Sequence, residues 1–184
     1  MINSFKPIQI QSEIIMLHPI RDSDMNRISE IEEDFYMILK EEANTEFIKE
    51  KRVNSIDQAK NFVFGIISNY SSNKSYMHLI TWKETNNVIG AINLITPGHV
   101  KEEYKLEEYN WMIEFFMHKN FWNHGIMTGL VNAVCSHLKS QNVNVIDAVC
   151  HVDNIGSHRV LEKNDFNKIQ KFDFNKYLYR KSQN

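Results

Sequence analysis

The sequence predicts a mixed α/β (α+β) fold formed by one domain over residues 1–184. Some segments alternate apolar and polar residues as strands do, and others repeat apolar residues at helical spacing. Segments 76–82 and 88–95 flank a pair of asparagines that suits the tight turn of a hairpin. The segment 109–150 has the pattern strand, helix, strand, and such a unit is parallel and right-handed when its strands are neighbours. A chain of 184 residues is long enough for one ordinary domain and short for two.

The N-terminal part begins with a strand over 13–18 that stops at Pro19. Asp22 or Ser23 suits the cap of a helix that follows, and the charged, aperiodic residues 40–54 indicate a loop long enough to be functional. The apolar positions that define the helix are Met25, Ile28, Ile31 and Phe35.

A second helix begins at Ser55, because Ser55 and Gln58 have the spacing of a capping box. Residues 97–98, Pro-Gly, end the hairpin and lead into a charged loop over 101–108. The remaining predicted elements are a strand over 109–118, a helix from Thr128, a buried strand over 143–150, a helix capped by Asp153 or Asn154, and a final strand or hairpin over 166–179.

Composition excludes several classes of partner. Lys and Arg number 21 and Asp and Glu 23, which gives a formal net charge of −2 and disfavours nucleic acid as a partner. No signal-peptide pattern and no bilayer-length apolar stretch are present, which predicts a cytoplasmic protein with no membrane partner. Cys135 and Cys150 lie in apolar runs without metal-ligand spacing, so we expect buried thiols and no metal cofactor.

The segment 121–128 joins a predicted strand to a predicted helix through Gly125. The start of a helix has unpaired N–H groups and the positive end of the helix dipole, so it can bind a phosphate or pyrophosphate. Gly125 would allow the backbone to approach such a ligand closely. A simple connection between the two elements is the alternative.

Three motifs resemble those of GNAT N-acetyltransferases, in particular the branch that acetylates the N-termini of ribosomal proteins. Residues 153–166 are similar to the family pattern N-x-x-S-x-x-V-L-E-K-x-G-F. Residues 121–128 resemble the Y-W-G-x-G-Y-A-T motif of that branch, and residues 17–19 followed by Asp24 resemble its L-R-P opening. The resemblance implies a GNAT-like, mostly antiparallel sheet with flanking helices, in which the central parallel strands splay apart.

The resemblance also implies acetyl-CoA as cosubstrate, bound between the strands 109–118 and 143–150. Asn154 would contact its pantetheine arm. Ser157 would protonate the departing thiolate, because Leu161 stands where some relatives have a tyrosine. The implied pyrophosphate contacts are the backbone amides of Asn123, His124, Gly125, Ile126, Met127 and Thr128.

Three residues depart from these motifs. Asn123 and Asp165 stand where the branch usually has glycine, and both residue types tolerate a positive φ, so they can keep the backbone shape. Met127 stands where the branch has a small residue and brings a long side chain to the phosphate path. We expect its flexible side chain to fold away.

Glu114 is the candidate general base. Partial enclosure by Met112 and a phenylalanine on the same face of its strand would raise its pKa. Relatives often have Glu at the place of Met112, so a strand-edge carboxylate without a catalytic role is an equal alternative. His118 is a further candidate.

The sequence therefore predicts an N-acetyltransferase that transfers acetyl from acetyl-CoA to a primary amine, either a protein N-terminus or a small molecule, by direct attack in a ternary complex. One alternative is a catalytically weak or silent CoA-binding or protein-interaction member of the same fold. Another is an acetyltransferase for a polyamine or aminoglycoside-like cation that the acidic segments 40–54 and 101–108 attract. A homodimer formed through exposed C-terminal aromatics is left open, and these are Phe172, Phe174, Tyr177 and Tyr179.

Overall fold

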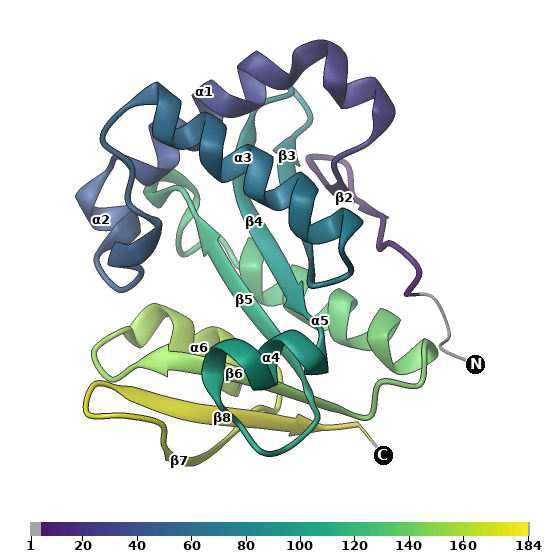
Figure 1. Cartoon of the computed structure of the whole chain (residues 1–184), viewed down its shortest axis with the longest axis vertical. Coiled ribbons are helices and arrows are strands. Elements are labelled where there is room, and N and C mark those ends of the chain that lie inside the picture. Colours follow the sequence, from purple (N-terminus) through teal and green to yellow (C-terminus); the bar gives the residue numbers. More distant parts are fainter. Residues whose placement is uncertain (1–4, 184) are drawn as a thin grey trace.

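The computed structural model describes residues 5–183 and is built around an eight-stranded sheet (Figure 1). Neighbouring strands follow the order β1-β2-β3-β4-β5-β6-β8-β7. The strands are β1 (Ile10–Gln11), β2 (Ile15–Pro19), β3 (Ser75–Trp82), β4 (Val88–Ile95), β5 (Trp111–Met117), β6 (Val145–His151), β7 (Asn167–Lys171) and β8 (Lys176–Ser182). The β5–β6 pair is parallel and the other pairs of this sheet are antiparallel, as predicted.

The parallel strands β5 and β6 diverge soon after they begin to pair. Their register partners are Trp111 with Ile146 and Met112 with Asp147, and both strands then continue without pairing to each other. From Ile113 onward, the backbone N–H and C=O groups on the edge of β5 that faces β6 are not paired with β6. The splayed central strands are thereby confirmed.

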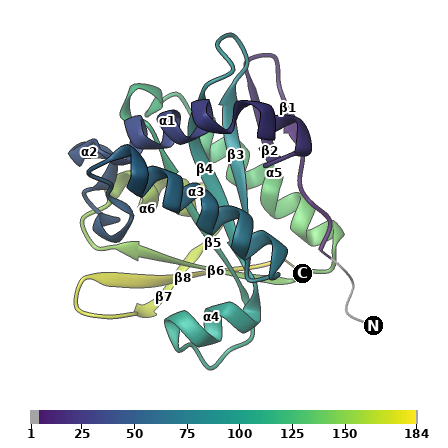
Figure 2. The same cartoon turned by 45° about the horizontal axis from the view of Figure 1, so that its top comes forward.

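Helices cover both faces of the sheet (Figure 2). Helices α1 and α3 pack together over β3 and β4, and α5 packs on the opposite face. The helices are α1 (Ile28–Leu39), α2 (Glu42–Thr45), α3 (Ile56–Ser71), α4 (Pro97–Tyr104), α5 (Ile126–Ser140) and α6 (Ile155–Glu162), with the 3₁₀ helices η1 (Asp22–Arg27), η2 (Lys49–Lys51) and η3 (Lys119–Phe121). Within residues 5–183 none of them is long and apolar enough to cross a membrane.

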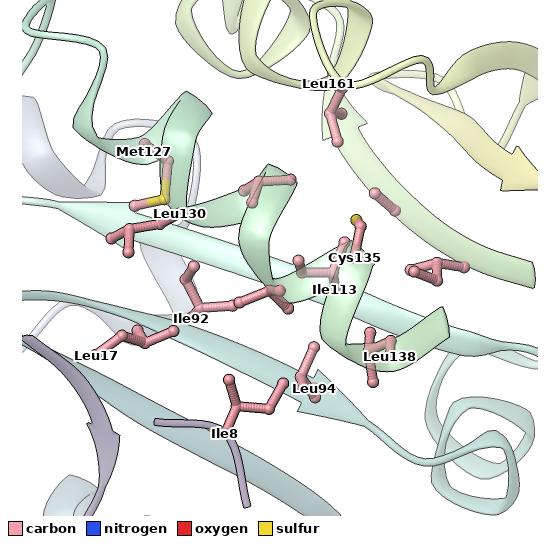
Figure 3. Packing of buried hydrophobic residues seen from close by; sticks show 14 of the residues in the cluster. Ile8, Leu17, Ile92, Leu94, Ile113, Met127, Leu130, Cys135, Leu138 and Leu161 are labelled. Atoms are coloured by element: carbon pink, nitrogen blue, oxygen red, sulfur yellow. The ribbon is translucent and has the colours of Figure 1, made fainter. Parts of the chain in front are cut away.

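Each layer of helices has its own apolar cluster against the sheet. Leu130 and Leu138 of α5 pack with Ile113 of β5 (Figure 3). On the opposite face, Phe35 of α1 and Val63 of α3 belong to a second cluster. Burial of each such side chain contributes about 1.5–3 kcal/mol to folding. The apolar residues at helical spacing in the sequence are thus the ones that pack against the two faces of the sheet.

The segment before α1 differs from the prediction. The helix expected to begin at a cap on Asp22 or Ser23 begins as the 3₁₀ helix η1, with Arg21 as its cap residue. Asp24 Oδ2 accepts hydrogen bonds from the backbone N–H and the Nε–H of Arg21, each at 2.9 Å. Met25, expected on the buried stripe, is 50% exposed. The regular α-helical spacing therefore starts only with α1.

The segment after β4 was expected to be a loop, but its first part is the helix α4. Pro97 lies at the start of this helix. A backbone N–H at this position would have no helical carbonyl as its acceptor, so proline, which lacks the N–H, loses no hydrogen bond there. Val100 is fully buried and packs with Met112. Residues 105–108 are irregular, as expected, and so are residues 109–110, where the strand was expected to have begun. Residues 40–54 contain the short helices α2 and η2 within an otherwise irregular segment.

The C-terminal residues form the predicted hairpin, with β8 inserted between β6 and β7. Its aromatic side chains do not form one exposed patch. Phe174 is 98% exposed, but Tyr179 is fully buried and Phe172 lies against the ring of Tyr104, with 6.1 Å between ring centroids. The aromatic surface proposed for a second chain is therefore smaller than expected.

Candidate functional site

A cavity of about 550 Å³ lies beside the diverging end of β5, and small-molecule sites commonly have this size. Its walls are the end of β5, the junction that follows, the first turns of α5 and α6, and the segment after α2. Most of the predicted site residues line it, namely Asn123, Gly125, Ile126, Met127, Thr128, Asn154 and Ser157. A second cavity, of about 760 Å³, lies at the opposite end of β5 against Trp111 and Val145 and contains none of the predicted site residues.

The junction between β5 and α5 has the backbone shape that an anion site requires. Gly125 is the N-cap of α5 with φ of 76°, and Asn123 has φ of 63°. Asp165 also has a positive φ, 60°, so both residues that replace family glycines keep the glycine-like conformation, as predicted. Because Gly125 has no side chain, it cannot cap the N–H groups of the first turn, and these groups border the cavity at Ile126 and Thr128.

Met127 folds away from the opening of the cavity, as expected. The residue is 6% exposed, and its side chain packs in the cluster beneath α5 together with Leu130 (Figure 3). The long side chain therefore fills the core under the first turn of the helix.

Asn154 and Ser157 lie together in the first turn of α6. Asn154 Oδ1 accepts a hydrogen bond from the backbone N–H of Ser157 at 3.1 Å, which caps the helix. Burial has the largest effect on the pKa of Cys150 on β6 and raises it to about 12, while the neighbouring Ser157 side chain acts in the opposite direction. Cys150 is thus a buried, protonated thiol, as predicted.

Two histidines that the sequence analysis singled out, His118 and His124, do not line the cavity. His124 is exposed beside the junction. His118 Nδ1 accepts a hydrogen bond from the backbone N–H of Asn120 at 3.2 Å and caps η3. Burial, the largest effect, lowers the pKa of His118, so its ring is neutral at pH 7 and serves as a hydrogen-bond acceptor.

Arg159 and Lys163 are residues of the cavity that sequence reasoning missed. Arg159 belongs to α6 and Lys163 is its C-terminal cap, and both line the cavity together with the start of α5. Their spacing of four residues places them on one side of the helix, and this signal was present in the sequence. Two cations beside an uncapped helix start favour a ligand with several negative charges.

The segment after α2 forms the opposite wall of the cavity. Phe47 borders the cavity and packs against His151 at the end of β6 in a tilted arrangement, with 5.1 Å between ring centroids. Asn44 fixes this segment, because its Oδ1 accepts from the backbone N–H of Lys119 at 2.8 Å and its Nδ2 donates to the carbonyl of Ile38 at 2.9 Å. Part of the segment 40–54 thus borders the cavity, and its functional role stays a prediction.

Glu114 does not line the cavity, although its chain neighbours Phe115 and Phe116 do. Its carboxylate lies in a polar cluster with Lys51, Tyr104 and Asn93. Burial raises the pKa of Glu114, but the charge of Lys51 and hydrogen bonds from Tyr104, Asn93 and Lys51 outweigh burial, so the pKa lies below its ordinary value. The expected raised pKa was wrong, because three groups distant in sequence stabilise the ionised carboxylate.

The comparisons agree with this geometry. The family model described as an acetyltransferase (GNAT) domain matches residues 15–167. An acetyltransferase of the GNAT family from Bacillus anthracis has 17% identity and a TM-score of 0.70, covering 95% of this chain and 98% of that chain.

Two other solved structures are similar to the same extent. The ribosomal-protein-S5-alanine acetyltransferase from Vibrio fischeri has 15% identity and a TM-score of 0.70, with 96% of this chain and 97% of that chain covered. A ribosomal L7/L12 α-N-protein acetyltransferase in complex with coenzyme A has 18% identity and a TM-score of 0.70, with 96% and 98% covered. A search of curated proteins gave no significant match. Because the family model spans most of the sequence, the chain belongs to the GNAT acetyltransferase family.

Proposed function

We propose that the whole chain acts as one domain that transfers an acetyl group from acetyl-CoA to a primary amine in a ternary complex. The observation that carries this proposal is the cavity at the diverging strands, which combines an uncapped helix start with the motif residues Asn154 and Ser157. Family membership supports acetyl-CoA as the donor.

The residues present fit the chemistry of coenzyme A. Its phosphates require N–H donors and cations, and the first turn of α5 supplies backbone donors while Arg159 and Lys163 supply charge. Its pantetheine arm is an extended amide chain, and the edge of β5 beyond Ile113 supplies backbone groups outside the ladder with β6. Asn154 Nδ2 is a further donor that its own capping bond does not use.

Acetyl-CoA, when bound, supplies an activated acyl thioester. We assign Ser157 as the proton donor to the leaving thiolate, because this residue lines the cavity and carries a hydroxyl in the first turn of α6. The positive end of the dipole of α6 stabilises negative charge that develops beside Ser157. A phenolic alternative at Leu161 is absent, since this residue is a buried leucine.

We assign Glu114 as the carboxylate that receives the proton of the amine, directly or through water. Its lowered pKa keeps it ionised at pH 7, so it is an acceptor of protons in its resting state. Several acidic residues of the flanking segments are engaged within the chain, including Glu41 with Lys119 and Glu42 with Arg52. These pairs reduce the excess negative charge that the polyamine hypothesis relied on.

Two measurements test the proposal. Isothermal titration with acetyl-CoA tests donor binding, and release of free CoA thiol tests transfer to alkylamines and to a peptide with an N-terminal alanine. We expect saturable binding and thiol release that requires an amine. Absence of heat and of a thermal shift at millimolar acetyl-CoA contradicts the proposal, and binding without thiol release supports the catalytically silent alternative.

A matched pair of variants sharpens the binding test. Arg159→Met combined with Lys163→Met removes the two cations at the cavity, whereas Lys101→Met removes one exposed cation on α4. We expect the double variant to weaken acetyl-CoA binding about tenfold or more, because each charge-assisted phosphate contact contributes about 1 kcal/mol or more. Lys101→Met is expected to bind as the unmodified protein does.

A further inference from the structure

A polar cluster lies on the face of β5 that η2 and α4 cover. Glu114 of β5 is the register partner of Asn93 of β4, and Asn93 Nδ2 donates to Glu114 Oε2 at 3.4 Å. Tyr104 of α4 donates its hydroxyl proton to Glu114 Oε1. Lys51 of η2 places its Nζ 3.3 Å from Glu114 Oε2. Both charged side chains remain reachable from solvent, Lys51 with 20% and Glu114 with 23% of the side chain exposed.

The cluster contains a hydrogen-bond acceptor without a donor in the described part of the chain, and more negative than positive charge. Asn93 Oδ1 is buried and has no hydrogen-bond donor among residues 5–183. Burial and then the charge of Glu114 raise the pKa of Tyr104, with smaller contributions from Glu50 and Glu103, so three carboxylates act on this place. One lysine neutralises only part of that charge. A cation with several N–H donors suits the cluster.

Lys51 can leave the cluster without disrupting regular structure. It belongs to the three-residue helix η2, which is closed by hydrogen bonds from the backbone N–H of Lys51 to Ile48 at 2.8 Å and from Arg52 to Lys49 at 3.1 Å. A swing of its side chain changes none of these backbone bonds. The same segment borders the cavity through Ile48, so a ligand there lies next to the chain that carries Lys51.

We propose that Glu114 and Asn93 form a docking site for the ammonium group of the acceptor, and that Lys51 is the internal cation that fills this site until a charged acceptor displaces it. The proposal rests on the proposed function for the identity of the acceptor as an amine. An acceptor ammonium reproduces the ion pair with Glu114 and adds a donor for Asn93 Oδ1. Lys51 thereby favours acceptors that are charged at neutral pH over neutral amines. Only a cation can replace the ion pair that Glu114 loses when Lys51 leaves.

The test uses binding and needs no turnover. n-Butylammonium chloride is titrated into the protein saturated with CoA, and n-butanol serves as the uncharged probe of similar shape. Lys51→Met removes the internal cation, Glu114→Gln removes the carboxylate charge, and Lys49→Met removes an exposed charge from the same η2 helix. Lys51→Gln repeats the first change with a polar side chain in case the methionine variant does not fold.

We expect Lys51→Met to bind butylammonium about tenfold more tightly, a change that corresponds to about 1.4 kcal/mol. Lys49→Met should bind it as the unmodified protein does, Glu114→Gln should lose the binding, and butanol should bind equally to all five proteins. Equal or weaker butylammonium binding by both Lys51 variants overturns the proposal. Failure of thiol release with every amine would contradict the proposed function instead, because this binding experiment does not depend on acetyl transfer.

Discussion

The side-chain oxygen of Asn154 accepts a hydrogen bond from the backbone N–H of Ser157 at 3.1 Å. The residue that we assign to the pantetheine arm therefore also begins the helix that carries the proposed proton donor. Asn154 lines the cavity and its capping bond leaves Nδ2 unused, so the two functions of its side chain would use different atoms. This separation makes the two functions testable one at a time.

Replacement of Asn154 should separate helix capping from CoA binding. Asn154→Asp keeps a capping oxygen but loses the amide donor, so we expect nearly unchanged stability and weaker CoA binding. Asn154→Ala loses both, and should also lower the free energy of unfolding by about 1 kcal/mol. Urea denaturation and isothermal titration with CoA measure the two effects. Equal CoA affinity in the unmodified protein and Asn154→Asp would show that the amide donor is not used.

Ser157→Ala should slow turnover far more than it weakens CoA binding. Loss of a general acid typically reduces kcat about a hundredfold or more, whereas a methyl group in place of the hydroxyl leaves the phosphate contacts intact. Ser136→Ala is the control, because Ser136 is an exposed serine of α5. Steady-state kinetics with thiol detection and CoA titration provide the two quantities. An unchanged kcat removes Ser157 from the mechanism.

Sequence patterns predicted the fold where local signals agree with long-range packing. The period of apolar residues identified α3 and α5 because each packs one face against the sheet. The positive φ values of Asn123 and Asp165 followed from the glycines that the similar family motifs have at these positions, together with the tolerance of Asn and Asp for positive φ. Helix α4 was missed because a Pro-Gly pair is a turn signal as well as a helix start, and only the packing of Val100 selects the helix.

The site was predicted only where local sequence signals define it. Asn154, Ser157 and the junction around Gly125 are close in sequence to the helices that hold them, so motifs reveal them. The environment of Glu114 depends on Lys51 and Tyr104, which tertiary folding brings from different elements. Its pKa therefore could not be derived from neighbours along β5.

Breaking the ion pair between Asp147 and Arg180 should strongly destabilise the sheet at the closed end of β5 and β6. Asp147 is fully buried and its carboxylate accepts from Arg180 Nε at 2.7 Å and Nη2 at 2.9 Å, with Asn110 Nδ2 at 3.2 Å. Asp147→Asn should lower the free energy of unfolding by about 3 kcal/mol, since a buried charge pair loses one partner.

Lys60→Met is the control for this prediction, because it breaks an exposed pair with Asp57 and should change stability by about 0.5 kcal/mol or less. Chemical denaturation of both variants measures the difference. Equal losses of stability would show that the buried pair contributes no more than a surface pair.

Stability should fall as the pH decreases from 7 to 5, in part because of His78. Its Nε2 accepts a hydrogen bond from the backbone N–H of Ile8 at 3.1 Å, and its Nδ1 lies 2.9 Å from the carbonyl oxygen of Tyr76, so the neutral ring fits and the charged ring does not. Burial, the largest effect, lowers the pKa of His78 to about 4.

The sign follows from the two states. The unfolded chain, with an ordinary histidine pKa of about 6.5, takes up a proton before the folded chain does, so this contribution is fully present above pH 6.5 and is lost as the pH falls toward 4. The loss is about 1.4 kcal/mol per pH unit, or about 2 kcal/mol at pH 5. His78→Gln cannot titrate, so its stability should fall less steeply over this range, whereas the exposed His124→Gln should follow the unmodified protein. Denaturant titrations at pH 7, 6 and 5 measure the slopes. Parallel slopes for His78→Gln and the unmodified protein would contradict the assignment, because only titration of the buried ring distinguishes the two chains.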